Sequence, residues 1–488
     1  MRRLMASDIC GMLNPVGTCM GEDVEVAGIT ADSRRVRPGY IFAVIHGTQA
    51  DGADYIEDAR RRGAAVLLCG QQHGSAGCQI IVDDVRTAFA QAAAIIAGEP
   101  SRSMLTIGVT GTNGKTTVTH MIRDVLTENG RECGLLGTIA CEFAGRRIAA
   151  ERTTPDAATL QETLRQMREA GCSAVVMEVS SHALDQKRVV GVDFNAAVFT
   201  NLTHEHLDYH GSMEAYYNAK ALLFRELKDA AVGVVNTDDK WGQRLSEEGL
   251  ACSVMSYGMN GAADFMAVDV ELDVDGSRFR LVTPSGSFAA KLRLLGRHNI
   301  SNALACAAVC KALGISEPEV LDVLAQMNPV RGRMEPVPVS DDFAVFVDYA
   351  HTGDALEHAL RTVREITAGR VIVVFGCGGD RDREKRPEMG RIAAEAADIV
   401  VVTSDNPRGE DPESIIDEIM EGISSADAHV ERVSDRAEAI ALALGLADCG
   451  DSVLIAGKGH ETYQEAGGRR IHFDDRERAL AAAGICGD

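Results

Sequence analysis

The chain has 488 residues, of which 49 are basic and 72 acidic, so its formal net charge is −23 at neutral pH. A surface this negative disfavours nucleic acid and anionic lipid as partners, and no apolar run reaches the roughly 18 residues that a membrane-spanning helix needs. With 45% hydrophobic residues, 25% charged residues and 13 scattered cysteines, the sequence is typical of a soluble cytoplasmic protein.

Residues 1–98 predict a small α/β domain. Short apolar runs, "YIFAVI", "AAVLLC" and "QIIVDD", alternate with the helical patterns "YIEDARRRG" and "RTAFAQAAAIIAG". The polar stretch "GEPSRS" follows and is typical of a linker. About 150 residues per domain predicts roughly three domains in all.

Residues 99–329 predict a larger, central domain. It opens with a strand, a glycine-rich loop and an amphipathic helix in "MLTIGVTGTNGKTTVTHMIRDVLTENG", and the buried strands "AVVMEVSS", "AAVFTNL" and "AVGVVNT" follow. This alternation predicts a doubly wound, mostly parallel sheet of the P-loop type. Residues 263–296 alternate differently, with glycine turns, and predict an antiparallel appendage.

Residues 330–488 predict a Rossmann-like α/β domain. The Pro/Gly-rich stretch "NPVRGRMEPVPV" marks its beginning, and the strands "FAVFVDYA", "RVIVVFG", "DIVVVTSD" and "DSVLIAGKG" alternate with helical segments. The dinucleotide fingerprint G-x-G-x-x-G is absent from the sequence, so NAD binding has little support.

The segment "GTNGKTT" is the strongest local signal for a function. Backbone N–H groups of a glycine-rich loop at a helix N-terminus bind phosphate. Lys115 can reach the β- and γ-phosphates, and the Thr116 hydroxyl can bind Mg²⁺. The strict P-loop pattern is not met, because Val109 stands where its first glycine belongs. A plain strand–helix turn is the alternative, but ATP or GTP binding is favoured.

Other polar groups follow buried strands or lie beside them, where α/β sheets bind ligands. Glu178 ends one strand, and a solvated loop carboxylate is the alternative. "NLTHEHLDYHG" is as compatible with a surface loop as with a metal site, since no cysteine accompanies it. Lys220 lies among apolar neighbours on a helix, where a lysine usually extends its amine to water. "TSDNPRGEDP" ends a buried strand in Arg408, which turn chemistry alone does not explain.

Ten motifs occur in the order found in the Mur ligases, and the chain resembles that family over essentially its whole length. No motif is specific by itself, but the ordered set is. The resemblance is nearest to the members that add 2,6-diaminopimelate. The motifs are "GTNGKTT", "TTPD", "EVSSHAL", "TNLTHEHLDYHG", "YYNAKALLF", "HNISNALA", "DYAHTGDAL", "GCGGDRD", "DNPR" and "GKGHE".

The resemblance implies an ATP- and Mg²⁺-dependent amide ligase of three domains. It implies that the first domain holds the UDP end of the substrate, the second binds ATP and the third brings the incoming amino acid. The implied reaction joins meso-diaminopimelate to UDP-N-acetylmuramoyl-L-alanyl-D-glutamate (UDP-MurNAc-L-Ala-D-Glu) through an acyl phosphate, in peptidoglycan precursor synthesis. A monomer that binds these small molecules is expected.

The resemblance also implies roles for individual residues. Lys115, Lys220 and His206 match catalytic positions, and Lys220 matches a lysine that CO₂ converts to a carbamate. A carbamate is an anion, so it can help to hold Mg²⁺ where an ammonium group would repel it. The residues that match metal positions are Thr116, Glu178, His206 and carbamylated Lys220. Those that match positions around the nucleotide and the hinge are Gly111, Thr112, Asn113, Gly114, Lys115, Thr116, Thr117, Asn299, Asn302, Arg333, Asp348 and His351.

Two further sets match substrate contacts. The set expected at the UDP-muramoyl dipeptide is Ser33, Thr48, Gln49, Ala50, Thr153, Thr154, Ser180, Gln186 and Arg188. The set expected at diaminopimelate is Arg381, Asp405, Asn406, Pro407, Arg408, Gly457 and Glu461. We expect Arg408 to bind the carboxylate that diaminopimelate has and lysine lacks, since a guanidinium can bind a carboxylate through two parallel hydrogen bonds.

Two classes of alternative remain. One is a related amide ligase with another substrate, such as a folylpolyglutamate synthetase or a lysine-adding Mur ligase, and the "DNPR" motif is evidence against both. The other is a P-loop kinase or a nucleotide-switch protein. A switch protein would hydrolyse ATP without needing a UDP-sugar peptide and an amino acid together.

Overall fold

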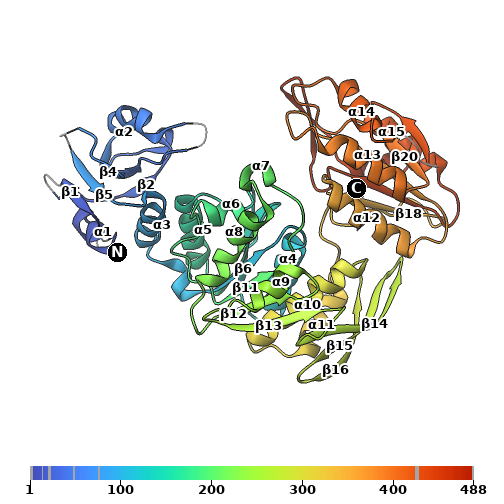
Figure 1. Ribbon diagram of the computed structural model, residues 1–488, viewed down its shortest axis with the longest axis horizontal. Coiled ribbons are helices and arrows are strands. Elements are labelled where there is room, and N and C mark those ends of the chain that lie inside the picture. Colours follow the sequence, from blue (N-terminus) through green and yellow to red (C-terminus); the bar gives the residue numbers. More distant parts are fainter. Residues whose placement is uncertain are drawn as a thin grey trace. The chain divides into compact units, whose positions relative to one another are not determined.

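The computed structural model describes residues 4–13, 15–19, 23–47, 50–74, 77–423 and 428–485. The chain forms two compact units, Met1–Ser256 and Tyr257–Asp488. Each unit combines helices with sheets, which confirms the predicted α/β class (Figure 1). Among the described residues, no helix is both long enough and apolar enough to cross a bilayer.

The first unit begins with a five-stranded sheet in the order β1-β5-β4-β3-β2, parallel except for β1. Successive residues of β3 and β4 face opposite sides, so α1 and α3 pack on one face and α2 on the other. The strands are β1 (Gly17–Cys19), β2 (Gly28–Thr30), β3 (Tyr40–Ala43), β4 (Ala64–Cys69) and β5 (Cys78–Ile81), and the helices are α1 (Ala6–Leu13), α2 (Ile56–Arg61) and α3 (Val85–Ile96).

The same unit then forms the predicted central sheet, whose strands run in the order β12-β11-β6-β10-β7-β8-β9. The pairs from β12 to β7 are parallel, and β8 and β9 are added antiparallel. The strands are β6 (Leu105–Thr110), β7 (Cys133–Leu136), β8 (Ala140–Phe143), β9 (Arg146–Ala149), β10 (Ala174–Glu178), β11 (Ala196–Phe199) and β12 (Val232–Asn236). The helices are α4 (Lys115–Glu128), α5 (Ala157–Glu169), α6 (Ser181–Asp185), α7 (Leu207–His210), α8 (Met213–Arg225) and α9 (Lys240–Ser246).

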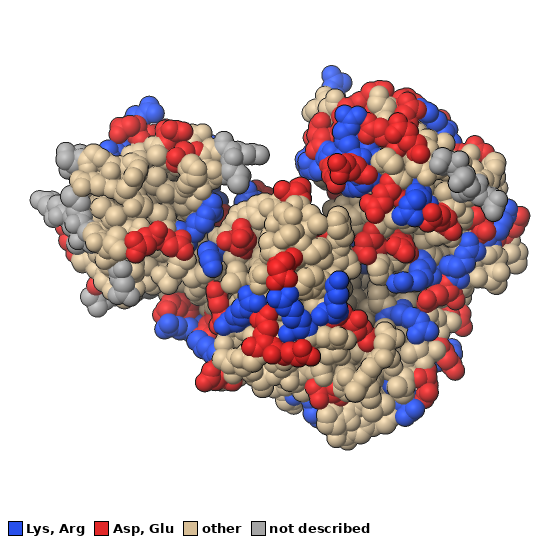
Figure 2. Space-filling view, in the orientation of Figure 1, with Lys and Arg blue, Asp and Glu red and all other residues tan. Residues whose placement is uncertain are grey.

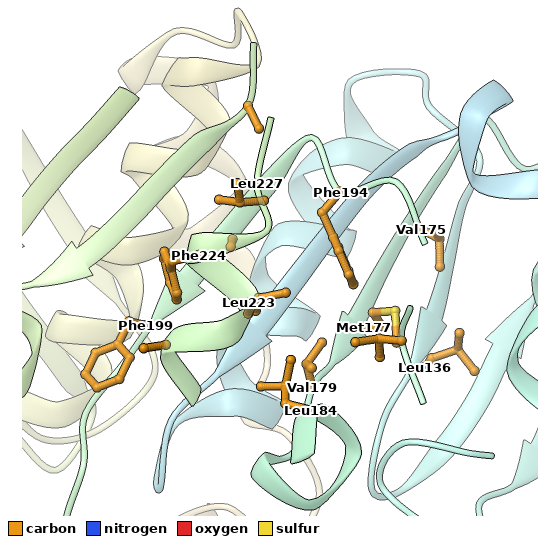
Figure 3. Packing of buried hydrophobic residues seen from close by; sticks show 14 of the residues in the cluster. Leu136, Val175, Met177, Val179, Leu184, Phe194, Phe199, Leu223, Phe224 and Leu227 are labelled. Carbon is orange, nitrogen blue, oxygen red and sulfur yellow. The ribbon is translucent and has the colours of Figure 1, made fainter. Parts of the chain in front are cut away.

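Strand β10 shows how this core directs a polar group to one face. Val175 and Met177 join a buried cluster with Leu184, Phe194 and residues of α5 and α8 (Figure 3). Side chains alternate along a strand, so Glu178 points to the opposite face, where α4 packs on β10. Burying an apolar side chain of this size contributes roughly 1.5–3 kcal/mol, which makes a slip of one residue along the strand costly.

The second unit begins with an antiparallel β14–β15–β16 meander, as predicted for residues 263–296. Strand β13 (Ser253–Gly258) crosses the boundary between the units, and a helical pair follows the meander. Ser316 and Glu319 form a capping box at the start of the second helix of this pair. The elements are β14 (Phe265–Asp273), β15 (Gly276–Thr283), β16 (Gly286–Leu292), α10 (Arg297–Ala312) and α11 (Glu317–Gln326).

The last part is a six-stranded sheet in the order β17-β18-β22-β19-β20-β21, parallel except for β17, with a separate β23–β24 hairpin. Its strands are β17 (Glu335–Pro336), β18 (Ala344–Asp348), β19 (Val371–Phe375), β20 (Ile399–Val402), β21 (His429–Arg432), β22 (Ser452–Ala456), β23 (Tyr463–Ala466) and β24 (Arg469–His472). Its helices are α12 (Gly353–Ile366), α13 (Lys385–Ala396), α14 (Pro412–Met420), α15 (Arg436–Leu446) and α16 (Asp475–Ala482).

Charged side chains of both signs are interspersed on the face of the molecule that Figure 2 shows. Many are paired locally, as Arg165 is with Glu162 and Glu169 on α5. Exposed pairs of this kind contribute little to stability, typically 0–1 kcal/mol. The groups that define the candidate site are instead buried or half-buried at the ends of parallel strands.

Candidate active site

The glycine-rich loop lies between β6 and α4, as the sequence predicts. Gly111 has a φ of 146°, and a Cβ there would lie 1.8 Å from Thr200 Oγ1, so a side chain does not fit. The Thr200 hydroxyl donates to the Asn113 carbonyl at 2.6 Å, and the Asn113 N–H donates to Asn201 Oδ1 at 2.9 Å. Gly114, with a φ of 85°, is the N-cap of α4. The loop is thus fixed at a helix N-terminus, which is the usual site for phosphate.

Lys115 and Thr116 begin α4 and point in different directions. Lys115 Nζ folds back over the loop and donates to the carbonyl oxygens of Gly111 at 2.9 Å and Thr112 at 2.7 Å. The buried Thr116 hydroxyl donates to Glu178 Oε1 at 2.9 Å, and Thr117 is buried as well. Lysine and hydroxyl therefore lie at the two sides of one loop, as a phosphate and its metal ion would require.

Glu178 is held by three donors. Besides Thr116, the Thr138 N–H donates to Oε1 and the Thr138 hydroxyl to Oε2, both at 2.9 Å. Gly137 leaves room for this carboxylate, since a Cβ there would lie 2.4 Å from Oε1. The described residues contain no group of three His, Cys, Asp or Glu side chains that could hold a metal. The hydroxyl and carboxylate oxygens fit Mg²⁺, which keeps several waters and phosphate oxygens as ligands.

Lys220 of α8 is 1% exposed, so its amine does not extend to water as an isolated helix would suggest. Its Nζ donates to the Gly111 carbonyl at 2.8 Å and lies 4.6 Å from the centre of the Tyr216 ring. Burial, and then the nearby Lys115 charge, hold the pKa of Lys220 well below its usual value. In the described part of the chain, Lys220 has no ion pair with a carboxylate. A neutral amine is the form that reacts with CO₂.

His206 lies beside this lysine pair. Burial lowers the pKa of His206 below its ordinary value, the Glu205 charge opposes this, and Lys220 and Lys115 lower the pKa further, so the site favours the neutral imidazole. Its ring meets that of His182 edge to face at 4.9 Å, and its φ is 56°. The zinc reading of this stretch has no support among the described residues, which form no ligand cluster of the required size.

Five of the nine residues expected at the UDP-muramoyl dipeptide form a hydrogen-bonded group around the end of β10. The Thr154 hydroxyl donates to the Glu178 carbonyl at 2.9 Å, and Arg188 donates to the Thr154 carbonyl at 2.9 Å and to Gln186 Oε1 at 2.7 Å. Ser180 caps α6 through the Ala183 N–H. Thr153 contacts Thr138, the partner of Glu178, at 3.1 Å. This group therefore adjoins the carboxylate beside the glycine-rich loop.

The other four expected UDP contacts come from the N-terminal part of the sequence. Ser33 begins a 3₁₀ turn, Ser33–Arg35, and is buried, whereas Ala50 is exposed. Thr48 and Gln49 lie outside the described residues. A role for these four positions stays a prediction.

In the second unit, the residues expected around the nucleotide lie at two places. Asn299 and Asn302 are buried in the first turns of α10, where Asn302 Nδ2 donates to Asn299 Oδ1 at 3.1 Å. Asp348 ends β18, and its carboxylate accepts from the N–H groups of Met334 and Ala350 at 2.7 and 2.9 Å. Burial raises the pKa of Asp348 above its ordinary value, and the charge of Arg333 offsets only part of this rise.

Aromatic rings surround this second place. The Arg333 guanidinium lies 4.9 Å from the centre of the Tyr349 ring. The same ring is 4.5 Å from the ring of His351 and 4.8 Å from that of His460. A cation and several rings together offer a surface on which a base could stack.

The loops after β19 and β20 are bonded to each other. The Gly379 N–H donates to the Asn406 carbonyl at 2.9 Å, and a Cβ on Gly379 would lie 2.0 Å from the Pro407 carbonyl oxygen. Glu410 Oε1 accepts from the Asp380 N–H at 2.5 Å and from the buried Arg386 at 2.8 Å. Parallel strands thus bring "GCGGDRD" and "DNPRGE" together, as expected for a ligand-facing edge.

Arg408 has a left-handed backbone, with a φ of 52°. The hairpin holds it there, since the Arg408 N–H donates to the Glu465 carbonyl at 2.9 Å and the Gly467 N–H donates to the Arg408 carbonyl at 2.7 Å. Its half-buried guanidinium donates from Nη1 to the Gly379 carbonyl at 2.7 Å. Arg381, by contrast, is exposed and donates to the Asp380 carbonyl at 3.0 Å.

Asn406 and Glu461 face each other across two loops. Asn406 Nδ2 donates to Glu461 Oε2 at 2.8 Å. Asp405 is buried, and a Cβ on Gly457, whose φ is 115°, would lie 2.9 Å from Asp405 Oδ2. Within this unit, the structure therefore brings Asp405, Asn406, Arg408, Gly457 and Glu461 together.

Models of three Mur ligase domains match this chain. They are described as the Mur ligase family catalytic domain, which matches residues 25–103, the Mur ligase middle domain, residues 109–310, and the Mur ligase glutamate ligase domain, residues 332–459.

The chain belongs to the Mur ligase family.

Individual Mur ligases match it over nearly their whole length. A UDP-N-acetylmuramoyl-L-alanyl-D-glutamate–2,6-diaminopimelate ligase from Geobacillus thermodenitrificans is 45% identical, covering 95% of this chain and 96% of its own. A protein of the same name from Gloeobacter violaceus is 47% identical, covering 94% of both chains. A solved structure with this name superposes with a TM-score of 0.71 at 34% identity, covering 94% of this chain and 95% of its own.

Three residues of the site were not anticipated from the sequence. Thr138 donates hydrogen bonds to Glu178, and the fully buried Lys458 contacts Glu461. The charge of Glu205 opposes the lowering of the pKa of both His206 and Lys220. Glu205 and Lys458 lie within the motifs "TNLTHEHLDYHG" and "GKGHE", whereas the available signal for Thr138 was its position just after the buried strand β7. Which of these side chains points to the site depends on contacts between distant segments, which sequence spacing does not contain.

Proposed function

We propose that this Mur ligase joins meso-2,6-diaminopimelate to UDP-N-acetylmuramoyl-L-alanyl-D-glutamate with hydrolysis of ATP to ADP, in peptidoglycan precursor synthesis. The observation that carries the proposal is the Thr116–Glu178 hydrogen bond of 2.9 Å beside the glycine-rich loop, where Lys115 and Lys220 both donate to the Gly111 carbonyl. The relatives that carry this name align with almost the whole chain.

The first step transfers the γ-phosphoryl group of ATP to an oxygen of the D-glutamyl side-chain carboxylate, and ADP leaves. Catalysis of such a transfer is mainly positioning and charge neutralisation. The N–H groups of the loop bind phosphate oxygens, and Lys115, which folds over the loop, neutralises charge on the transferred group. The resulting acyl phosphate has a carbonyl carbon that an amine can attack.

The second step joins the amino acid. The neutral amine of diaminopimelate attacks the acyl carbon, the tetrahedral intermediate collapses, phosphate leaves and the nitrogen loses a proton. Arg408 is proposed to bind the distal carboxylate of diaminopimelate, and Arg381 is proposed to bind the other end of this amino acid. Glu461 is proposed to bind the ammonium group of the amino acid. The bonds between the two loops and the hairpin support fixed positions for Arg408 and Glu461.

Thr116 and Glu178 would hold Mg²⁺, which supplies charge neutralisation to the bound phosphates. His206 and a carbamate on Lys220 would complete a second metal position. The carbamate has an electrostatic basis, because a buried ammonium beside Lys115 is repelled, whereas a carbamate there would be attracted. It forms when the Lys220 amine bonds to the carbon of CO₂ and loses a proton.

An ADP-release assay tests the proposed function. Purified protein is given ATP, Mg²⁺ and UDP-MurNAc-L-Ala-D-Glu, with a panel of amino acids that includes meso-diaminopimelate, L-lysine and L-glutamate. We expect ADP release only when the UDP substrate and diaminopimelate are both present, and a product whose mass is the sum of the two minus water. ADP release without either partner would instead indicate a nucleotide switch or a kinase.

Three coarser features belong to the same proposal. We assign residues 1–98 to the UDP substrate, 99–329 to ATP and 330–488 to the amino acid, which the matched family ranges support. We also propose a monomer that works in the cytoplasm, where nucleotide substrates are available. Sedimentation of the purified protein at several concentrations tests the monomer.

A further inference from the structure

We propose that Lys458 is a positioning residue that orients the Glu461 carboxylate toward the ammonium group of the incoming amino acid. This inference rests on the proposed function, in which Glu461 meets that ammonium. Lys458 lies in the loop after β22, within "GKGHE", three residues before Glu461. Glu461 takes part in binding the amino acid in the proposed reaction, whereas Lys458 has no role in either of its two steps.

Lys458 contacts the carboxylate from the interior of the protein. Its Nζ lies 3.2 Å from Glu461 Oε2 and donates to Asn406 Oδ1, also at 3.2 Å. The lysine side chain is 0% exposed, whereas that of Glu461 is 18% exposed. The carboxylate therefore has one side against a buried ammonium and another side toward solvent.

Asn406 adds a second donor to the same oxygen. Its Oδ1 accepts from both Lys458 Nζ and the Glu465 N–H, the latter at 2.9 Å. Two donors at Oδ1 fix the amide so that Nδ2 points to Glu461 Oε2, at 2.8 Å. In the described part of the chain, Oε2 thus takes two donors and Oε1 accepts no hydrogen bond. Oε1 is left for a ligand.

The lysine also connects this carboxylate to the Arg408 loop. Asn406 precedes Arg408 by two residues, and Glu465, which donates to Asn406, also accepts the Arg408 N–H. The group that binds an ammonium and the group that binds a carboxylate are thereby held in one network. Such a network can bind the carboxylate and the ammonium group at the distal end of diaminopimelate, because its two binding groups are held at a fixed separation.

A purely structural ion pair is the competing explanation. Burying a lysine is costly unless its charge is paired, and removing one partner of a buried pair destabilises a protein in any context. A structural pair would change stability, but it would not change the response to one chemical group of the substrate. Discrimination between two substrates that differ only in that group therefore separates the two explanations.

The experiment compares meso-diaminopimelate with L-2-aminopimelate, which has the same carbon chain and both carboxylates but lacks one amine. The ratio of their kcat/KM values is measured in the wild type and in Lys458→Met. We expect this ratio to be about tenfold lower in the variant, mainly because the KM for diaminopimelate rises. A misdirected Glu461 carboxylate no longer stabilises the bound ammonium group. The KM for the UDP substrate should not change.

Two further variants make the result decisive. Lys311→Met breaks another lysine–glutamate contact, in which Lys311 on α10 lies 2.8 Å from Glu317 on α11, and this variant should keep the wild-type ratio. Asn406→Ala removes the second donor and keeps the lysine, so it should also lower the ratio and decides the matter if Lys458→Met does not fold. A folded Lys458→Met or Asn406→Ala with the wild-type ratio would overturn the inference. Failure of the wild type to ligate diaminopimelate would instead refute the proposed function.

Discussion

Removing the Arg408 guanidinium should abolish the preference for meso-diaminopimelate over L-lysine. The two amino acids differ by one carboxylate at the end distal to the attacking amine. Arg408→Ala removes the group proposed to bind that carboxylate, and Arg408→Lys keeps a charge but not the planar fork. We expect both variants to lose kcat/KM for diaminopimelate and to leave the low value for lysine almost unchanged.

The size of the effect follows from the surroundings of Arg408. A hydrogen bond to a charged group contributes about 1.5–3 kcal/mol, so two parallel bonds to a carboxylate contribute roughly 3–6 kcal/mol. The Arg408 guanidinium is half-buried and donates a hydrogen bond to the Gly379 carbonyl. It keeps this bond when the substrate L-lysine, which lacks the distal carboxylate, takes the place of diaminopimelate, so the guanidinium is not left wholly unpaired. We therefore take the lower part of the range, ~3–4 kcal/mol, which is a discrimination of about 10²–10³-fold.

Steady-state ligation with each amino acid, at saturating ATP and UDP substrate, gives two values of kcat/KM for the wild type and two for each variant. Arg391→Ala is a matched control, because Arg391 on α13 is exposed and pairs with Glu395 one turn further along the same helix. It should retain both rate constants. The reasoning is refuted if Arg408→Ala keeps both its diaminopimelate activity and its discrimination, since "DNPR" would then be only a turn.

Three other predictions concern charge at the remaining positions. Lys220→Ala should nearly abolish ligation with an unchanged circular dichroism spectrum, and acetate or formate should partly restore it; near-normal turnover would exclude a role for the carbamate. Lys115→Ala and Thr116→Ala should each lose ATP turnover, and the loss in Lys115→Ala should be about 100-fold (~3 kcal/mol). Raised Mg²⁺ should partly restore the turnover of Thr116→Ala. Unchanged turnover in Lys115→Ala would mean that the phosphate binds elsewhere. Hydrogen bonds from Arg386 lower the pKa of Glu410 from 4.5 to about 2, so the stability that the Glu410 carboxylate contributes is complete above pH 4.5 and is lost as the pH falls toward 2. Between these pH values, the melting temperature of Glu410→Gln should therefore fall less than that of the wild type. Equal falls in melting temperature would contradict this prediction.

Much of the fold was predictable from local pattern. Runs such as "AVVME" and "VIVVF" are too apolar and too β-branched for anything but buried parallel strands, and they form β10 and β19. The glycine loop before α4 followed from its residues, because Gly111 and Gly114 need positive φ. The ordered motifs indicated the family, and the domain matches agree with it.

The tertiary structure decided which of these groups meet. Thr116 and Glu178 are 62 residues apart in sequence, and only the pairing of β6 with β10 brings them to 2.9 Å. Lys220 was expected on a half-buried face but is enclosed, because α8 packs its lysine against a loop 109 residues away. Likewise, the left-handed backbone of Arg408 depends on a hairpin almost 60 residues further on.

The physical reason is that strand and helix formation depend on the period of a segment's own side chains, which the sequence displays directly. Burial, pKa and hydrogen-bond partners depend instead on which segments pack together. Lys458 illustrates the difference: its position after a strand was visible in the sequence, but nothing in the sequence distinguished an exposed loop lysine from one that is wholly buried against Glu461 and Asn406.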